Sequence, residues 1–293
     1  MKNLIDPIQL AAKTEKIVCK GNKRRYLRFG TTPDYGTGIA TGYTLGCNLR
    51  CLFCWASETR DNLEISNSFY SPEEVFEILY NIAKKHPKIN RVRISDGEPT
   101  IGREHLFELL ELVEKSDLDN FILETNGTLL GNDEKYVRDL SKFRKLFVRV
   151  GLKAGTSEAY SRITKALPET FELPFQAIRY LYKYKIPCSI AAMSQDPRFM
   201  TALERISLIV KLGTIDPALV LKLEEEMTIL FPTAKKRLEA GGWNSNDLNL
   251  PFFLKGPLFK FVQISYEPIR LVAKRRISFK HTIKNIIQLR HGI

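Results

Sequence analysis

Long apolar runs are missing from this sequence of 293 residues. No stretch approaches the roughly 18 apolar residues that a membrane-spanning helix needs. The N-terminal residues interrupt their apolar positions with Asp6, Pro7 and Lys13, which is not the pattern of a signal peptide. Repeats and low-complexity segments are also absent from the sequence. These features predict a globular cytoplasmic protein without a membrane span.

Cysteine and histidine are scarce, with five and four residues respectively. Cys47, Cys51 and Cys54 nevertheless lie within eight consecutive residues, and no further cysteine or histidine lies near them. This grouping favours reduced thiols that hold a metal over a disulfide scaffold. A structural zinc site needs four ligands, usually in two pairs, and the second pair is missing. A zinc knuckle completed by the distant Cys19 or by a histidine is the alternative.

Negative charge is scarce at both ends of the chain. The first 34 residues contain eight Lys or Arg and three acidic residues, and residues 251–293 contain nine against Glu267 alone. The part between them is close to neutral, although the whole chain has a formal net charge of +12. Basic ends favour an anionic partner, either nucleic acid or a membrane surface. A solvated surface of a lysine-rich protein is the alternative.

Short apolar runs alternate with helical patterns through the middle of the chain. Strands are predicted at residues 38–46, 89–95, 120–125, 145–153, 186–193 and 217–224, and helices at 71–87, 103–116, 133–143, 156–185 and 198–213. Ser71 followed by Pro72 indicates the start of the first of these helices. About six strand–helix units favour parallel pairing and are too few for a closed eight-stranded barrel. The expected fold is therefore α/β, a partial (β/α)6 TIM-like barrel with an open parallel sheet.

The pattern changes near both ends of the chain. Residues 1–37 are predicted to be a basic N-terminal segment, residues 38–240 the core and residues 241–293 a basic C-terminal extension. Lys and Arg alternate with aromatic residues in residues 19–30 and 259–293, a composition typical of segments that bind phosphates and stack on bases. For the C-terminal residues, a helix packed on the open barrel edge is favoured, then a nucleic acid such as tRNA, then a membrane surface.

The loop "CNLRCLFC" at residues 47–54 directly follows the first predicted strand of the core. Three thiolates at these spacings can bind three irons of a four-iron, four-sulfur cluster and leave the fourth iron without a protein ligand. The loop resembles the CxxxCxxC signature of the radical S-adenosylmethionine (radical SAM) superfamily. The resemblance implies that Cys47, Cys51 and Cys54 hold a [4Fe–4S] cluster and that the methionyl group of S-adenosylmethionine chelates the free iron. It also implies that Phe53 lies near the adenine.

Two turns after the next strands resemble further segments of the same superfamily. Residues 96–99, "DGEP", are similar to a Gly-Gly-Glu-Pro segment, which implies that Asp96, Gly97 and Glu98 bind the cofactor's amino group. An ordinary strand-to-helix turn with capping acids is the alternative. Thr125 and Asn126 stand in a Thr-Asn-Gly corner that lines the ribose side in the family, although an Asn-Gly turn explains these residues equally well.

The strand at 145–153 ends in Gly151-Leu152-Lys153, which resembles an Asp-Leu-Lys triplet of glycyl-radical activases. Lys153 is accordingly expected to bind the methionyl carboxylate, since a lysine on an apolar strand needs an anionic partner or access to solvent. Gly151 stands where those relatives have an acid, so ribose binding has no assigned residue. Cys188 is expected to be a small residue packed within a strand.

The resemblance covers roughly residues 38–224 and implies an enzyme that cleaves S-adenosylmethionine reductively to a 5′-deoxyadenosyl radical. This radical would abstract hydrogen from an unidentified substrate, a small molecule or a nucleic acid. A flavodoxin or ferredoxin is implied as electron donor. The alternatives are an activating enzyme for a glycyl-radical protein, which Gly151 speaks against, and a non-catalytic protein stabilised by zinc. No side chain is assigned a catalytic role, and no auxiliary cluster is expected because Cys19 and Cys188 are isolated.

Overall fold

The computed structural model describes residues 4–66, 68–228 and 232–244 of the chain. Its strands in these ranges are β1 (Cys19–Lys20), β2 (Lys23–Thr32), β3 (Ile39–Thr44), β4 (Phe69–Tyr70), β5 (Arg91–Ser95), β6 (Asn120–Thr125), β7 (Leu146–Leu152), β8 (Cys188–Ala192) and β9 (Glu224–Glu225). Its helices are α1 (Pro7–Val18), α2 (Ser57–Asp61), α3 (Pro72–Lys85), α4 (Arg103–Lys115), α5 (Thr128–Asn132), α6 (Glu134–Leu140), α7 (Ser157–Thr164), the 3-10 helix η1 (Pro168–Glu172), α8 (Leu173–Lys183), α9 (Ala202–Ile215), α10 (Pro217–Leu221) and α11 (Pro232–Ala240). Within the described ranges, no helix has both the length and the hydropathy that a bilayer span requires.

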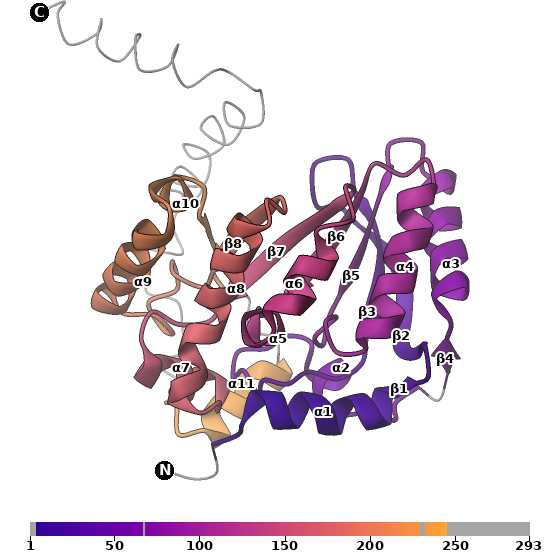
Figure 1. Ribbon diagram of the computed structural model, residues 1–293. Helices are drawn as coiled ribbons and strands as arrows, with labels where there is room; N and C mark the ends of the chain where they lie inside the picture. The colour runs from indigo at the N-terminus through magenta and orange to yellow at the C-terminus, as the bar shows by residue number, and fades with distance from the viewer. Residues whose placement is uncertain (1–3, 67, 229–231, 245–293) are drawn as a thin grey trace, which may run out of the picture. The chain divides into compact units, whose positions relative to one another are not determined.

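The described strands form one sheet in the order β1-β2-β3-β5-β6-β7-β8-β9, with β4 paired to β2. From β3 to β9 each strand runs parallel to the next. Helices connect these strands, and α4, α6 and α8 lie in a row on one face of the sheet (Figure 1). This arrangement confirms the predicted α/β fold, an open and mostly parallel sheet of the partial TIM-like kind.

The two faces of the sheet differ in polarity, as β7 shows. Its residues alternate between buried and half-buried positions, with the apolar Leu146, Val148, Val150 and Leu152 buried. Arg149 and Gly151 lie between them on the other face and are half-buried. Since side chains alternate along a strand, one face packs on the helices and the other forms the inner surface of the open barrel.

Local capping explains where several helices begin. Ser71 accepts a hydrogen bond from the Glu74 N–H, and the Glu74 carboxylate accepts one from the Ser71 N–H, which forms a capping box at the start of α3. The helix predicted from Ser71 and Pro72 is therefore confirmed.

The strand predicted at residues 217–224 is wrong for most of its length. Residues Pro217–Leu221 form helix α10, because the Asp216 carboxylate accepts the Ala218 N–H at 2.7 Å and Pro217 occupies the first turn. The strand β9 is limited to Glu224–Glu225. A short apolar run fits a strand and a buried helix equally well, so its pattern alone did not separate the two.

The basic N-terminal residues are part of the folded sheet. Strand β2 pairs antiparallel with β3 from Tyr26 to Thr32. Arg24 is 0% exposed and Tyr26 1% exposed, so these members of the basic and aromatic pattern face the interior instead of a nucleic acid. Cys19 is half-buried against an apolar cluster. The C-terminal part of that pattern, residues 259–293, lies outside the described residues.

Candidate functional site

The cysteine loop leaves the carboxyl end of β3 and packs against the end of α7. The Arg50 and Leu52 N–H groups donate to the carbonyls of Thr164 and Ile163, each at 2.9 Å. Two arginines bind the cysteine carbonyls. Arg60, 5% exposed, donates to the Cys51 carbonyl at 2.6 Å, and Arg237 of α11 donates to the Cys54 carbonyl. Backbone contacts thus hold the loop, and its three cysteines form no disulfide. The Cys47 sulfur accepts the Leu49 N–H at 3.4 Å.

The three thiols interact with one another in a buried setting. Burial, together with the neighbouring Glu98, Cys51 and Cys54, raises the pKa of Cys47 to about 12. Burial also raises the pKa of Cys51 to about 11 and that of Cys54 above its ordinary value. Three adjacent thiols that oppose each other's ionisation become thiolates only when a cationic centre compensates them, as happens on metal binding.

This donor set fits an iron–sulfur cluster. In the described ranges no three Cys, His, Asp or Glu side chains converge on the position of a single ion. A cluster does not require such convergence, because each cysteine binds a different iron. Cys188 lies elsewhere, half-buried on β8, and burial raises its pKa to about 11.

Phe53 lies in an aromatic group beside the cluster cysteines. It is 6% exposed, and its ring centroid lies 5.2 Å from that of Phe199, which in turn lies 5.3 Å from Trp243. The predicted contact between Phe53 and adenine stays a prediction.

The turn at Asp96 and Gly97 lies directly against the cysteine loop. Both residues have a positive φ, 59° and 51°, and a Cβ on Gly97 would lie 2.3 Å from the Gly46 carbonyl oxygen. The Glu98 N–H donates to the same carbonyl at 2.7 Å. Only glycine permits this approach, so Gly97 fixes the distance between the turn and the first cluster cysteine.

Asp96 has hydrogen-bonding capacity left at this turn. Its Oδ2 accepts the Thr59 hydroxyl at 3.5 Å, while its Oδ1 is buried without a hydrogen-bond partner. Burial raises the pKa of Asp96 to about 7. An unpartnered buried oxygen is costly, so it indicates a place where a donor such as an ammonium would be stabilised.

Glu98 has its hydrogen bonds satisfied within the protein. It is 1% exposed, and its Oε1 accepts the Thr100 N–H at 3.1 Å, the Thr100 hydroxyl at 2.6 Å and the Thr125 hydroxyl at 2.7 Å. Its Oε2 accepts the Asn126 N–H at 2.8 Å. The carboxylate therefore joins the turn after β5 to the corner after β6.

Asn126 connects that corner to the cysteine loop. Its amide nitrogen donates to the Asn48 Oδ1 at 2.8 Å and lies 4.0 Å from the Cys47 sulfur. Its amide oxygen accepts the Thr128 hydroxyl at 2.6 Å. Asn48, which is fully buried, was not singled out in the sequence, and its position between two cysteines was the available signal. The structure thus brings residues 96–98, 125–126 and the cysteine loop into one network.

Lys153 supplies a positive charge that acts on Cys51 and Cys54. Burial raises the pKa of Cys51 and Cys54, and Lys153 is among the cations that oppose this effect. Across the described residues, Lys153 has no hydrogen bond or ion pair. A Cβ on Gly151 would lie 2.8 Å from the Lys153 ammonium. The glycine that replaces the expected acid therefore leaves space for this side chain on the inner face of β7.

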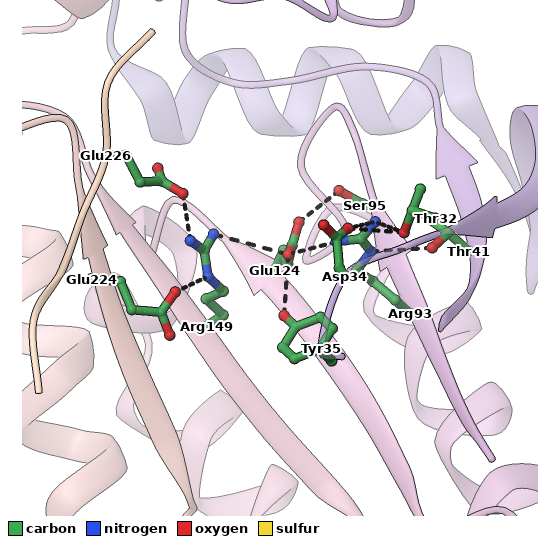
Figure 2. Close-up of polar contacts among 10 residues, drawn as sticks. All are labelled: Thr32, Asp34, Tyr35, Thr41, Arg93, Ser95, Glu124, Arg149, Glu224 and Glu226. Carbon is green, nitrogen blue, oxygen red and sulfur yellow. Dashed lines mark hydrogen bonds and ion pairs between the residues drawn. The ribbon is translucent and has the colours of Figure 1, made fainter. Parts of the chain in front are cut away.

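A ladder of charged side chains crosses the inner face of the sheet, and Figure 2 shows its members pointing toward one another from neighbouring strands. Arg93 donates to Glu124 at 3.0 Å and forms a 3.0 Å ion pair with Asp34. Arg149 pairs with Glu224 at 3.0 Å and with Glu226 at 2.5 Å. Sequence reasoning missed this ladder, although charged residues in the middle of apolar strands were a visible signal. It makes the inner surface polar instead of apolar.

The comparisons with known proteins match the part of the chain that contains these site residues. The family model described as "Radical SAM superfamily" matches residues 42–194, a range that includes the cysteine loop and the three following strand ends. The chain belongs to the radical SAM superfamily. Enzymes of this superfamily bind a [4Fe–4S] cluster and S-adenosylmethionine, so these are the cofactors that the site has to accommodate.

Several characterised proteins are similar over part of this radical SAM chain. A probable GTP 3′,8-cyclase of Methanocaldococcus jannaschii is 30% identical over 119 residues, covering 41% of this chain and 37% of the relative. A cysteine-type anaerobic sulfatase-maturating enzyme of Clostridium perfringens is 31% identical over 157 residues, covering 50% and 40%. The chain thus spans less than half the length of these relatives.

Solved structures of similar fold include anSMEcpe with bound AdoMet, at 27% identity and a TM-score of 0.40, covering 50% of this chain and 39% of that one. A structure of TYW1 matches at 16% identity and a TM-score of 0.46, covering 69% and 71%.

Proposed function

We propose that this chain is a radical SAM enzyme that holds a [4Fe–4S] cluster on Cys47, Cys51 and Cys54. With S-adenosylmethionine bound, the cluster supplies an electron that cleaves the cofactor to a 5′-deoxyadenosyl radical able to abstract hydrogen from a substrate. The observation that carries the proposal is the contact between the Asp96–Glu98 turn and the cysteine loop, through the 2.7 Å bond from Glu98 N–H to the Gly46 carbonyl. This contact holds a turn that can accept a cation beside three thiols that can bind a metal.

Different residues of this chain bind the ammonium and the carboxylate of the cofactor's methionyl group. Asp96 offers its unpartnered oxygen to the ammonium, and Gly97 lets this turn lie close against the cysteine loop. Glu98 acts by holding the turn, since its oxygens already accept four protein donors. Lys153 has the charge and the free hydrogen-bonding capacity to bind the carboxylate. Thr125 and Asn126 then line the site through their hydrogen bonds to Glu98 and Asn48.

The inner face of the barrel supports a polar substrate. Arg93, Glu124 and Arg149 line this face beyond the cofactor turn, and the half-buried Glu224 and Glu226 flank Arg149. Charged groups held in place by ion pairs recognise polar molecules by hydrogen bonds and reject apolar ones, because an apolar group there would leave polar groups unpaired. A small polar molecule is therefore favoured as substrate. Binding of tRNA through residues 259–293, and an electron donor such as a flavodoxin or ferredoxin, stay predictions.

Anaerobic reconstitution with iron and sulfide tests this function. The expected result is about four iron and four sulfide ions per chain, as a single cubane cluster requires. Addition of S-adenosylmethionine and a strong reductant should then release 5′-deoxyadenosine. A chain that binds one zinc ion and no iron would instead support the zinc-stabilised binding protein. Formation of a glycyl radical on an added partner protein would support the activating enzyme.

A further inference from the structure

Arg24 of β2 is the most deeply buried arginine of the described residues, with an exposure of 0%. Its guanidinium donates to three backbone carbonyls. It reaches the Glu98 carbonyl at 2.9 Å, the Pro99 carbonyl at 3.3 Å and the Leu45 carbonyl at 3.4 Å. Arg24 therefore lies behind the cofactor turn and joins it to the residue that leads into the cysteine loop.

The three carbonyls explain why an arginine is needed at this position. Leu45, Glu98 and Pro99 follow the carboxyl ends of β3 and β5, beyond the sheet pairing. The Glu98 carbonyl also accepts the Ile101 N–H at 3.1 Å, and among the described residues Arg24 is the donor to the other two carbonyls. A planar guanidinium presents several N–H groups in a fixed fork, so one side chain can satisfy all three. A lysine ammonium is a point charge and reaches fewer carbonyls in a fixed geometry.

The charge of Arg24 also has a role at this turn. Within the described residues, neither Arg24 nor the buried Glu98 carboxylate takes part in an ion pair. The two opposite charges act on the same short turn, one bound to its backbone and the other part of it. Buried charges are retained only where dipoles or opposite charges compensate them. Here carbonyl dipoles compensate Arg24, and four hydrogen-bond donors compensate Glu98.

We propose that Arg24 is a positioning residue for S-adenosylmethionine, which fixes the separation between the cluster loop and the turn that binds the cofactor's amino group. This inference rests on the function proposed above for that site. The methionyl group must reach the cluster and the turn at the same time, so a small shift between these two segments weakens both contacts together. The turn is also tied to these segments by the Glu98 N–H to Gly46 carbonyl bond and by the Thr44 hydroxyl to Asp96 carbonyl bond, and Arg24 adds the bonds to the Glu98 and Pro99 carbonyls.

The test compares Arg24→Gln and Arg24→Lys with the wild-type chain after anaerobic reconstitution. Iron content, the Kd of S-adenosylmethionine by calorimetry, and the electron paramagnetic resonance spectrum of the reduced cluster with and without the cofactor are measured. We expect iron content close to wild type, a Kd raised at least tenfold in Arg24→Gln and a smaller rise in Arg24→Lys. The spectral change that the cofactor causes in the wild type should be weakened in the same order.

Arg25→Gln is the matched control. Arg25 is the next residue of the same strand, donates to the Leu63 carbonyl at 2.8 Å and lies over the Phe69 ring at 4.6 Å. The Arg25→Gln variant should bind S-adenosylmethionine with the Kd of the wild type. An unchanged Kd in cluster-loaded Arg24→Gln, or an equal loss in Arg25→Gln, overturns the proposal. A wild-type chain that binds no cluster refutes the proposed function itself, and this is seen before any variant is compared.

A second measurement needs no variant and therefore covers the case in which Arg24→Gln does not fold. Hydrogen–deuterium exchange is followed in the reconstituted wild-type chain with and without S-adenosylmethionine. If Arg24 couples the strand to the turn, the cofactor should slow exchange in residues 95–101 and in residues 22–28 together. Protection confined to residues 95–101 contradicts the proposal.

Discussion

The carboxylate of Glu98 accepts the Thr125 hydroxyl at 2.7 Å, and so joins the ends of two neighbouring parallel strands. Both groups are buried, with exposures of 1% and 5%. The bond sets the turn after β5 against the corner after β6, the two segments that we propose to bind the cofactor. A carboxylate that accepts four donors is hard to replace by any other side chain.

Glu98→Gln should destabilise the fold. The amide nitrogen is a donor and would face the Asn126 N–H or the Thr100 and Thr125 donors, which leaves buried groups unpaired. We expect a loss of about 1–3 kcal/mol in the free energy of unfolding, measured by urea denaturation. Glu104→Gln, at an exposed position of α4, is the control and should change stability by less than about 0.5 kcal/mol. Equal stability of the two variants would show that Glu98 is not held as described.

The cluster ligands are tested by metal content. Cys51→Ala removes one of the three proposed cluster ligands, and the reconstituted chain should lose most of its iron and its iron–sulfur absorbance. Cys188→Ala removes a half-buried thiol on β8 and should retain both. Full iron loading of Cys51→Ala would rule out the assignment.

Gly151→Ala tests the space beside Lys153. The added Cβ would lie 2.8 Å from the ammonium, which can move away because it ends a flexible side chain. We expect a severalfold weaker Kd for S-adenosylmethionine, with a change in stability below about 0.5 kcal/mol. Gly30→Ala, whose Cβ meets nothing within 4 Å, is the control and should bind as the wild type does. Wild-type affinity in Gly151→Ala would argue against a carboxylate-binding role for Lys153.

His105 predicts a pH dependence of stability. Its Nδ1 lies 2.7 Å from the Asn22 carbonyl, which can only accept, so Nδ1 donates and Nε2 accepts the Tyr26 hydroxyl at 2.8 Å. Burial lowers the pKa of His105 from 6.5 to about 4. Between these values the unfolded chain binds a proton that the folded chain does not, so stability is present above pH 6.5 and is lost as pH falls toward 4. The full loss is about 3 kcal/mol.

Denaturation of wild type and His105→Gln at several pH values between 4 and 7 isolates this effect. Asp96, whose pKa burial raises to about 7, contributes the opposite slope in both proteins. The difference between the two proteins should therefore shrink as pH falls. His86→Gln, on an exposed residue, should follow the wild type. A difference that does not change with pH would show that His105 titrates normally.

Glu124→Gln should weaken the ladder on the inner face. The variant leaves Arg93, 9% exposed in its side chain, with Asp34 as its remaining ion-pair partner. Removing one partner of a buried pair costs roughly 2–4 kcal/mol, which urea denaturation would detect. Glu111→Gln removes one partner of the exposed pair with Lys142 and should cost less than about 0.5 kcal/mol. Similar losses in both variants would mean that the ladder does not stabilise the sheet.

The parallel core was predictable because its strands are short apolar runs separated by helices with clear starts. Strand 120–125 has the predicted bounds, and the helix after Ser71 has its capping box. The strand prediction for residues 217–224 was wrong because it relied on their apolar composition and did not use Asp216, which caps a helix there. The sequence indicated the cysteine loop and the turns that follow β5 and β6 because the order of residue types in these segments is unusual.

The supporting residues were not predictable in the same way. Arg24 belongs to a basic and aromatic pattern that fits a solvent-facing surface, and burial of its guanidinium depends on three carbonyls from distant segments. Asn48 and Glu124 likewise act through partners from other strands and helices, such as Thr128 for Asn48 and Ser95 for Glu124. Sequence periodicity reports which face is apolar, whereas such contacts exist only after the strands have paired.

In the part of the chain that the structure describes, the sheet ends on strands of two residues each, β1 and β4 on one side and β9 on the other. β2 extends beyond these short strands, because in the described chain its residues from Tyr26 to Thr32 pair with β3 alone. One side of this stretch therefore offers unpaired peptide groups to a strand from a second molecule. A barrel left open for a substrate is thus exposed to intermolecular β-pairing along β2, which charged side chains such as Arg28 oppose.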